Sequence, residues 1–275
     1  MPFTPAHIAA ILPLVRTPLP AAALVAGSMA PDLPYFVPLG IPRDLSHSLV
    51  GIPLVDIPMG VGALVLWAFV FRAPLLAFAP GWLRLRFRVP PRAGWSWRAA
   101  VVQASLVLAA LFVGILTHFV WDAFTHADGW VVVNVPAMQR VISYFTIYRW
   151  LQYLSSAIGL AIVAGWIVVW VRRTPAGVDH WSSRRVSPTW RRVAWIVVVG
   201  VTLALALAMW LPNVLAGFDP FDRRLVFLTV TLSIAVGGLL AVVLCLGWYL
   251  FPKSKPAPYA QMERSTATTL PRSSA

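Results

Sequence analysis

The sequence predicts an all-α fold, a polytopic helical membrane bundle in which five clear transmembrane helices follow a set of N-terminal half-helices. Of the 275 residues, 59% are hydrophobic and only 11% are charged, whereas a soluble domain carries about 25% charged residues. Five apolar segments are each near the ~20 residues that a helix needs to cross hydrocarbon. They lie at 49–71, 99–121, 150–171, 193–211 and 225–250.

The region before residue 48 is also apolar, but five prolines divide it into pieces too short to span singly, because proline breaks a helix. These are Pro13, Pro18, Pro20, Pro31 and Pro34. We expect one or two half-helices there, which either span in part or re-enter the membrane. The first positive charge is Arg16, so the basic start of a signal peptide is missing and no cleavage is expected.

The distribution of charge predicts the orientation. The net charge is +13, and sixteen of the 22 basic residues lie in 72–98, 172–192 and the tail after Phe251. All three segments follow odd-numbered spans, so one assignment places them together on the cytoplasmic side. The charge therefore indicates topology rather than nucleic-acid binding, and the expected partners are membrane lipids with anionic headgroups. Twenty arginines against two lysines are typical of a GC-rich bacterial genome, so we expect a bacterial cytoplasmic (inner) membrane.

Three parts follow from this reading. Residues 1–171 form a membrane domain with the candidate site, 172–251 add two further transmembrane helices, and 252–275 form a disordered cytoplasmic tail because they are polar and rich in Ser, Thr and Pro. The single cysteine, Cys245, can form no internal disulfide, and it argues against a thiolate metal site.

Residues 117–130, THFVWDAFTHADGW, place histidines and aspartates at the end of an apolar span. His118 and Asp122 are four residues apart, so they project from one face of a helix, and His126 follows one turn later if the helix persists. An imidazole and a carboxylate at this spacing can bind one cation, and they suit zinc, manganese or iron. Alternatively, the two form a buried hydrogen-bonded pair in which the carboxylate fixes the imidazole tautomer.

The predicted topology gathers further ionisable residues at the same outer boundary, where such groups are costly and usually functional. Each has another reading: Asp32 could cap a short helix, Ser46 could cap the first span, and His7 could sit at the interface. Asp56 could support a metal-bound histidine or make a structural hydrogen bond. The full set at the boundary is His7, Asp32, Asp44, His47, His118, Asp122, His126 and Asp128.

The segments MPFTPAHIAAILPL, AGSMAPDLPYF, LSHSLVGIPL and LTHFVWDAFTHADGW, in this order over most of 1–171, resemble the bacterial membrane family called domain of unknown function 4184. More remotely, P-D, then H-S, then H-x-x-x-D is similar to the YdjM-like group of inner-membrane metal-dependent hydrolases. That resemblance implies ligand roles for His7, Asp32, His47, His118 and Asp122. The group has H-R-x-x-T-H-S where this chain has Pro42 in place of the first histidine.

We therefore expect a metal-dependent membrane hydrolase that acts on a lipid or phosphoester at the outer membrane–water boundary. The cofactor would be a divalent metal, zinc or manganese, bound by His7, Asp32, His47, His118 and Asp122. Asp44, His126 and Asp128 are candidates for the general base or for support behind the ligands. The alternative is a non-enzymatic transporter or scaffold with a structural polar or metal cluster, since a structural site is closed by four ligands while a catalytic one keeps a position open.

Overall fold

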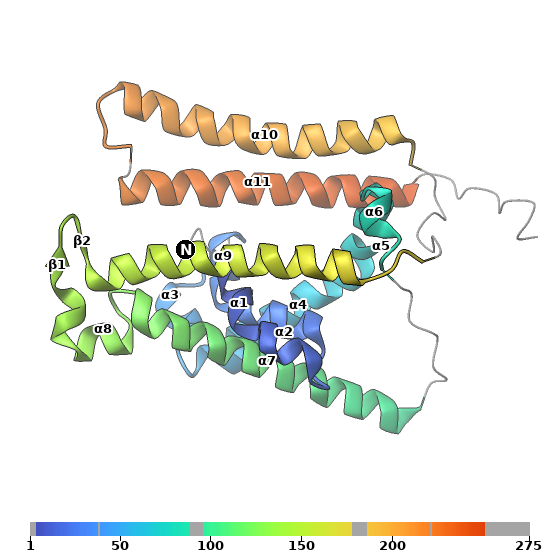
Figure 1. Ribbon diagram of the computed structural model, residues 1–275, viewed down its shortest axis with the longest axis horizontal. Coiled ribbons are helices and arrows are strands. Elements are labelled where there is room, and N and C mark those ends of the chain that lie inside the picture. Colours follow the sequence, from blue (N-terminus) through green and yellow to red (C-terminus); the bar gives the residue numbers. More distant parts are fainter. Residues whose placement is uncertain (1–3, 38, 88–95, 178–185, 221, 251–275) are drawn as a thin grey trace, which may run out of the picture.

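A computed structural model describes residues 4–37, 39–87, 96–177, 186–220 and 222–250 (Figure 1). Five helical stretches are long and apolar enough to cross a membrane, so the all-α prediction is confirmed and the chain is a multi-pass membrane protein. The predicted cytoplasmic tail, 252–275, lies outside the described residues. The stretches are Ile52–Phe78, Trp97–Asn134, Ile147–Arg173, Pro188–Leu215 and Arg224–Leu250.

The N-terminal region consists of short pieces, as its prolines predict. The 3-10 turn η1 (Thr4–His7) leads into α1 (Ile8–Ile11) and a second 3-10 turn, η2 (Leu12–Arg16). Helix α2 (Ala21–Met29) then continues into the 3-10 turn η3 (Ala30–Tyr35). At 1.5 Å per residue, none of these pieces can span a bilayer, and they pack instead against the longer helices (Figure 1).

The first span is irregular. It follows α3 (Arg43–Ser46), and it consists of α4 (Ile57–Leu66) and α5 (Arg72–Phe78) with a wider π-helical turn before each, Ile52–Asp56 and Trp67–Phe71. Pro53 and Pro58 have no backbone N–H, which explains why the first of these turns departs from α-helical bonding. The short helix α6 (Gly81–Arg84) ends this region.

The second and third spans are long and regular. Helix α7 (Trp97–Thr125) is followed by α8 (Trp130–Asn134) and the 3-10 turn Pro136–Gln139. A small antiparallel hairpin of β1 (Val141–Ile142) and β2 (Phe145–Thr146) then leads into α9 (Ile147–Arg173). The hairpin and α8 lie beyond the C-terminal end of α7, where they cover one end of the bundle (Figure 1).

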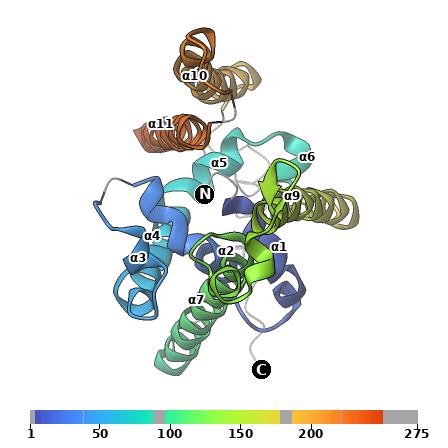
Figure 2. The same cartoon turned by 90° about the vertical axis from the view of Figure 1, so that its left-hand side faces the viewer.

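Helices α10 (Pro188–Leu215) and α11 (Arg223–Leu250) pair with each other and stand to one side of the other helices (Figure 2). They join the first span mainly through α11, where the Tyr249 hydroxyl donates a hydrogen bond to the Phe69 carbonyl at 2.8 Å. The helix ends next to the two arginine-rich loops lie at one end of the bundle, and the hairpin lies at the other (Figure 1). This grouping agrees with the predicted topology.

Two glycines let the backbones of α2 and α7 touch. A Cβ at Gly27 would lie 2.3 Å from the Leu111 carbonyl oxygen, and one at Gly114 would lie 2.5 Å from the Leu24 carbonyl oxygen. Small residues permit such close approach between helices in membranes. Leu24 and Leu111 are fully buried beside this contact. The contact fixes the position of the C-terminal end of α2, which lies directly before η3.

A third glycine positions the start of the described chain. A Cβ at Gly159, on α9, would lie 2.9 Å from the Ala6 carbonyl oxygen and 3.3 Å from the Trp121 ring. The absence of a side chain therefore lets η1 lie directly against α9 and α7. As a consequence, His7 is brought into the space between α7 and η3.

Candidate metal centre

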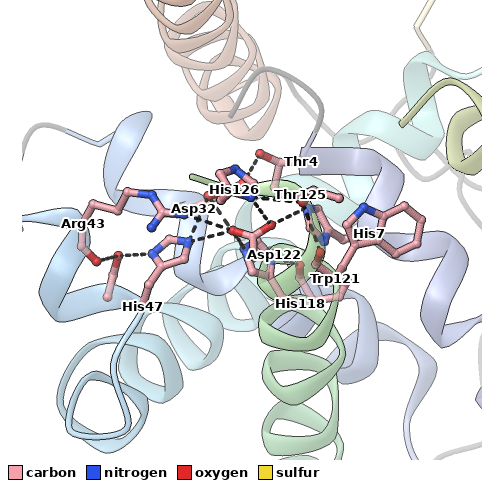
Figure 3. A network of polar contacts seen from close by, with 12 residues as sticks. Thr4, His7, Asp32, Arg43, His47, His118, Trp121, Asp122, Thr125 and His126 are labelled. Carbon is pink, nitrogen blue, oxygen red and sulfur yellow. Dashed lines mark hydrogen bonds and ion pairs between the residues drawn. The ribbon is translucent and has the colours of Figure 1, made fainter. Parts of the chain in front are cut away.

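The structure brings the five predicted ligands into one buried cluster (Figure 3). The cluster lies near the C-terminal end of α7, beyond which the hairpin is found (Figure 1). The side chains come from four separate parts of the chain. His7 ends η1, Asp32 lies in η3, and His47 directly follows α3, while His118 and Asp122 lie one turn apart on α7. All five side chains are at most 8% exposed.

Two histidine nitrogens and two carboxylate oxygens, which we call the ring of four, are neighbours at 3.4–3.8 Å. Three of these residues, His47, His118 and Asp122, also offer ligand atoms within 4.8 Å of one another. Nε2 of His47 lies 3.6 Å from Oδ1 of Asp32 and 3.4 Å from Oδ2 of Asp122. Nε2 of His118 lies 3.8 and 3.5 Å from the same two oxygens. A tetrahedral ion with bonds of ~2.0–2.1 Å has ligand atoms about 3.4 Å apart. The four separations are therefore within a few tenths of an ångström of those a bound ion would need.

The two histidines of the ring of four each make a further contact through Nδ1, the nitrogen that faces away from the carboxylates. Nδ1 of His118 lies 2.8 Å from the Ser28 carbonyl oxygen, which can only accept, so Nδ1 carries the proton and Nε2 keeps its lone pair. Nδ1 of His47 lies 3.0 Å from the Ser46 hydroxyl. Both Nε2 atoms are buried and have no hydrogen-bond partner among the described residues. Buried polar groups are usually satisfied, and two such nitrogens that face two carboxylates are a donor set suited to a cation.

Asp32 and His7 extend the cluster toward α9. Oδ2 of Asp32 accepts a hydrogen bond of 2.6 Å from the Thr4 hydroxyl. The His7 ring stacks on His118 with centroids 4.0 Å apart, and its Nε2 lies 3.7 Å from Oδ1 of Asp122. His7, Asp32 and His118 also offer one ligand atom each within 4.8 Å of one another. His7 is therefore a fifth possible donor, next to the ring of four.

The helix does not persist through His126. Helix α7 ends at Thr125, and His126 has an extended backbone with φ −116° and ψ 147°. From there its Nδ1 lies 3.0 Å from Oδ1 of Asp122 and 3.1 Å from the Thr125 hydroxyl, while its Nε2 lies 3.3 Å from the Gln152 side-chain nitrogen. His126 thus contacts a candidate ligand and does not face the ring of four itself.

Arg43 connects the cluster to the surface. Its Nη2 lies 3.2 Å from Oδ2 of Asp122, and its Nη1 donates a hydrogen bond of 2.8 Å to Oδ2 of Asp128. The side chain of Arg43 is 24% exposed and that of Asp128 is 59% exposed. Asp44, by contrast, is exposed on α3, and no hydrogen bond or ion pair joins it to the other described site residues. Of the candidates for the general base, Asp128 is therefore linked to the cluster through Arg43, whereas Asp44 makes no contact with it.

The residues outside the membrane spans show how burial and charge act together. Burial, with the neighbouring His118, lowers the pKa of His7 to about 3. Burial opposes ionisation of Asp32, but contact with His47 and the nearby His118 hold the pKa of its carboxyl well below the usual range. Burial also opposes protonation of His47, yet its contacts with Asp122 and Asp32 raise its pKa. His7 and Asp32 are thus held in the forms that bind a cation.

Two of the alternative readings can be compared with the contacts. Ser46 does not cap the first span; it is the last residue of α3, and the Ser48 hydroxyl instead accepts a hydrogen bond from the Gly51 N–H at 3.0 Å. Asp56 is fully buried, and neither of its carboxylate oxygens has a hydrogen-bond partner among the described residues. Asp56 therefore neither supports a histidine nor makes the structural hydrogen bond considered for it.

Sequence reasoning missed three contributors, Thr4, Arg43 and the Ser28 carbonyl group. Thr4 lies three residues before His7, on the same side of a helical turn, which was a usable signal. Arg43 stands beside Asp44, and its sequence position alone does not show that it turns toward Asp122. The Ser28 contact uses a backbone atom, so no residue type could have indicated it.

The donor set of imidazoles and carboxylates suits zinc or manganese. The one cysteine, Cys245, is buried on α11 and belongs to no group of possible ligands found among the described residues. A model of the family described as Domain of unknown function (DUF4184) matches residues 1–248. No curated protein and no solved structure matches the chain.

Proposed function

The chain belongs to the DUF4184 family, and we propose that it is a metal-dependent membrane hydrolase that acts on a lipid or phosphoester at the outer membrane–water boundary. The observation that carries the proposal is the ring of four donor atoms, in which two buried histidine nitrogens face two carboxylate oxygens and have no hydrogen-bond partner among the described residues. Their N···O separations of 3.4–3.8 Å exceed those of hydrogen bonds and suit ligands of a shared cation.

In this proposal, each metal ligand is oriented by a contact with a neighbouring group. Asp32, His47, His118 and Asp122 hold the ion, and the supporting contacts keep their donor atoms pointed inward. A divalent cation that took water as a further ligand beside these residues would lower the pKa of that water to about 7 and polarise the scissile group. His126 positions Asp122 through its contact with Oδ1. Asp128 is the better placed of the remaining base candidates, because Arg43 ties it to the same ligand.

Arg43 favours an anionic substrate. Its guanidinium group lies beside Oδ2 of Asp122 and is partly open to solvent. A guanidinium fork matches the geometry of phosphate oxygens and can bind two of them at once. A positive group fixed next to the reacting centre also stabilises the charge that develops during hydrolysis. A phosphoester therefore fits the site better than a neutral ester.

A structural role is the second candidate, and two observations favour it. Four protein ligands would close a tetrahedral site, which is typical of a structural metal. Arg43 and His126 both contact Asp122, so the carboxylate is partly compensated without any metal. In that case the cluster would tie η1, η3, α3 and α7 together, and catalysis would play no part.

The test compares Asp122→Asn with Asp56→Asn in the full chain purified in detergent. Both are buried aspartates within membrane spans, but only Asp122 belongs to the ring. We expect Asp122→Asn to lose bound metal and hydrolysis of phosphoester substrates, while Asp56→Asn keeps both. A parent protein that retains a metal and hydrolyses no phospholipid or phosphoester would favour the structural role. Equal metal content in both variants would remove Asp122 from the ligand set.

A further inference from the structure

A groove of about 560 Å³ runs along the outside of the bundle between α1, α7 and α9. This lies within the range of small-molecule pockets, ~300–1,000 Å³. Its walls are formed mainly by aliphatic and aromatic side chains. Those on which the argument depends are Ala10, Val113, Leu116, Val120, Phe124 and Leu151.

Each of the three hydroxyl groups in the wall already donates its hydrogen bond to a carbonyl oxygen of its own helix. Thr117 donates to the Gly114 carbonyl oxygen at 2.7 Å, and Thr125 donates to the Trp121 carbonyl oxygen at 3.1 Å. Ser155 donates to the Gln152 carbonyl oxygen at 3.5 Å. The groove therefore offers a ligand dispersion contacts and burial from water, and a hydrocarbon chain is the chemistry that it fits.

The groove lies where hydrocarbon surrounds the protein. Its walls belong to the second and third membrane-spanning stretches, Trp97–Asn134 and Ile147–Arg173. From Val113 to Thr125 it follows twelve residues of α7, which is about 18 Å along a helix. Val120 in its wall is 63% exposed. In a bilayer this surface faces acyl chains, and the groove is long enough to take a large part of one.

One end of the groove reaches the candidate metal centre. The Trp121 ring, part of the wall, lies 5.4 Å from the His7 ring between centroids. Thr125 also lines the wall, and its hydroxyl lies 3.1 Å from His126, which contacts Asp122. Thr125 and His126 further line a small polar pocket that includes Arg149 and Gln152. The apolar groove is thus directly followed by a polar pocket, to which Arg149 contributes a positive charge.

We propose that this groove holds one acyl chain of a phosphate-bearing membrane lipid, so that the substrate is drawn directly from the bilayer. That the bound lipid is a substrate rests on the proposed function. Binding of the lipid itself can be tested independently. The chain would lie along α7 and α9, while the phosphate group would lie at the polar end, near Arg149 and the cluster. A soluble phosphoester would have no use for the groove.

The binding test uses the full chain in vesicles of phosphatidylethanolamine and phosphatidylglycerol, with a small fraction of phosphatidylglycerol that carries a photoreactive diazirine in its acyl chain. Crosslinked peptides are mapped by mass spectrometry. We expect at least fivefold more label on 113–125 and 151–155 than on the exposed face of α10 at Ile196 and Leu203, which are 68% and 63% exposed. Equal labelling of the groove and α10 would overturn the proposal.

Val120→Trp fills the groove, and Val102→Trp is its matched control, because both valines are exposed on α7, at 63% and 58%, and only Val120 lines the groove. We expect Val120→Trp to abolish the excess label and Val102→Trp to keep it. If Val120→Trp instead leaves the label unchanged, or dissociates a dimer seen by native mass spectrometry, the occupant is not a lipid chain and the proposal fails.

Metal content and hydrolysis measured on the same samples separate this inference from the proposed function. Excess label at the groove with no metal and no hydrolysis would support lipid binding and refute the enzyme. If the protein is an enzyme, the ratio of lipid hydrolysis to p-nitrophenyl phosphate hydrolysis should fall at least tenfold in Val120→Trp relative to Val102→Trp. If the protein is active and this ratio is unchanged, the proposal that the groove binds the lipid substrate fails, while the proposed hydrolase activity stands.

Discussion

Nδ1 of His118 donates a hydrogen bond to the carbonyl oxygen of Ser28, 90 residues earlier in the chain and 2.8 Å away. The contact exists because Gly27, next to Ser28, and Gly114, one turn before His118, let α2 and α7 touch. A backbone atom of a half-helix thus fixes the tautomer of a candidate ligand. The geometry of the cluster therefore depends on how the apolar N-terminal region packs against α7.

Gly114→Ala tests this connection. Its Cβ would lie 2.5 Å from a backbone oxygen and 2.7 Å from the Ser28 nitrogen, so α2 must move away. We expect a lower melting temperature, a loss of about 1–3 kcal/mol in the free energy of unfolding, and weaker metal retention. Gly165→Ala is the control, since nothing lies within 4 Å of its Cβ. Normal metal retention in a destabilised Gly114→Ala protein would show that the packing and the site are independent.

Arg43→Gln tests the preference for a phosphate group. Charge-assisted hydrogen bonds contribute about 1.5–3 kcal/mol, so the Kd of inorganic phosphate for the metal-loaded protein should rise at least tenfold. Metal content should not change, because Arg43 contributes no ligand atom to the ring. Arg140→Gln, an exposed arginine before the hairpin, is the control. Identical calorimetric Kd values for the two variants would remove Arg43 from the anion site.

Much of the site could be predicted because its chemistry is local in sequence. His118 and Asp122 are one helical turn apart, and the prolines around Asp32 forced a break exactly where a polar side chain could turn inward. The route by which Asp32 and His47 reach α7 could not be predicted, since it depends on close backbone contacts such as Gly27 with Leu111. The end of α7 at Thr125 occurs together with contacts of His126 to Asp122 and Gln152, and the sequence pattern did not indicate these contacts.

The pH dependence should differ between the metal-free and metal-bound protein. The pKa of His47 is raised in the folded state, so its protonated form stabilises the metal-free fold below the unfolded pKa of ~6.5, and this contribution is lost as pH rises through the folded pKa. The pKa of His7 is lowered to about 3, so its protonation destabilises the fold. This effect of His7 on stability is confined to pH values below ~6.5.

We therefore expect the melting temperature of the metal-free protein to fall as the pH rises above about 6.5. Metal affinity should rise over the same range, because a cation competes with the His47 proton. Differential scanning fluorimetry with and without zinc measures both. In His47→Gln, both trends should flatten. A metal-free melting temperature that rises with pH in this window would contradict the assignment.

The predicted orientation can be tested in a Cys245→Ser background. Tyr144 in the hairpin is 87% exposed and Trp82 on α6 is 58% exposed. The hairpin and α6 lie toward opposite ends of the bundle (Figure 1). A membrane-impermeant maleimide should label Tyr144→Cys on intact cells and Trp82→Cys only after permeabilisation. The reverse pattern would place the cluster on the cytoplasmic side.

The central claim is that His47, His118, Asp32 and Asp122 bind one divalent cation. X-ray absorption at the zinc edge, on purified full-length protein loaded with one equivalent and dialysed, tests it most directly. We predict a first shell of nitrogen and oxygen at ~2.0–2.1 Å without sulfur, with imidazole scattering that weakens in His118→Gln. A protein that keeps no zinc after dialysis, or a spectrum without imidazole scattering that His118→Gln leaves unchanged, would contradict it.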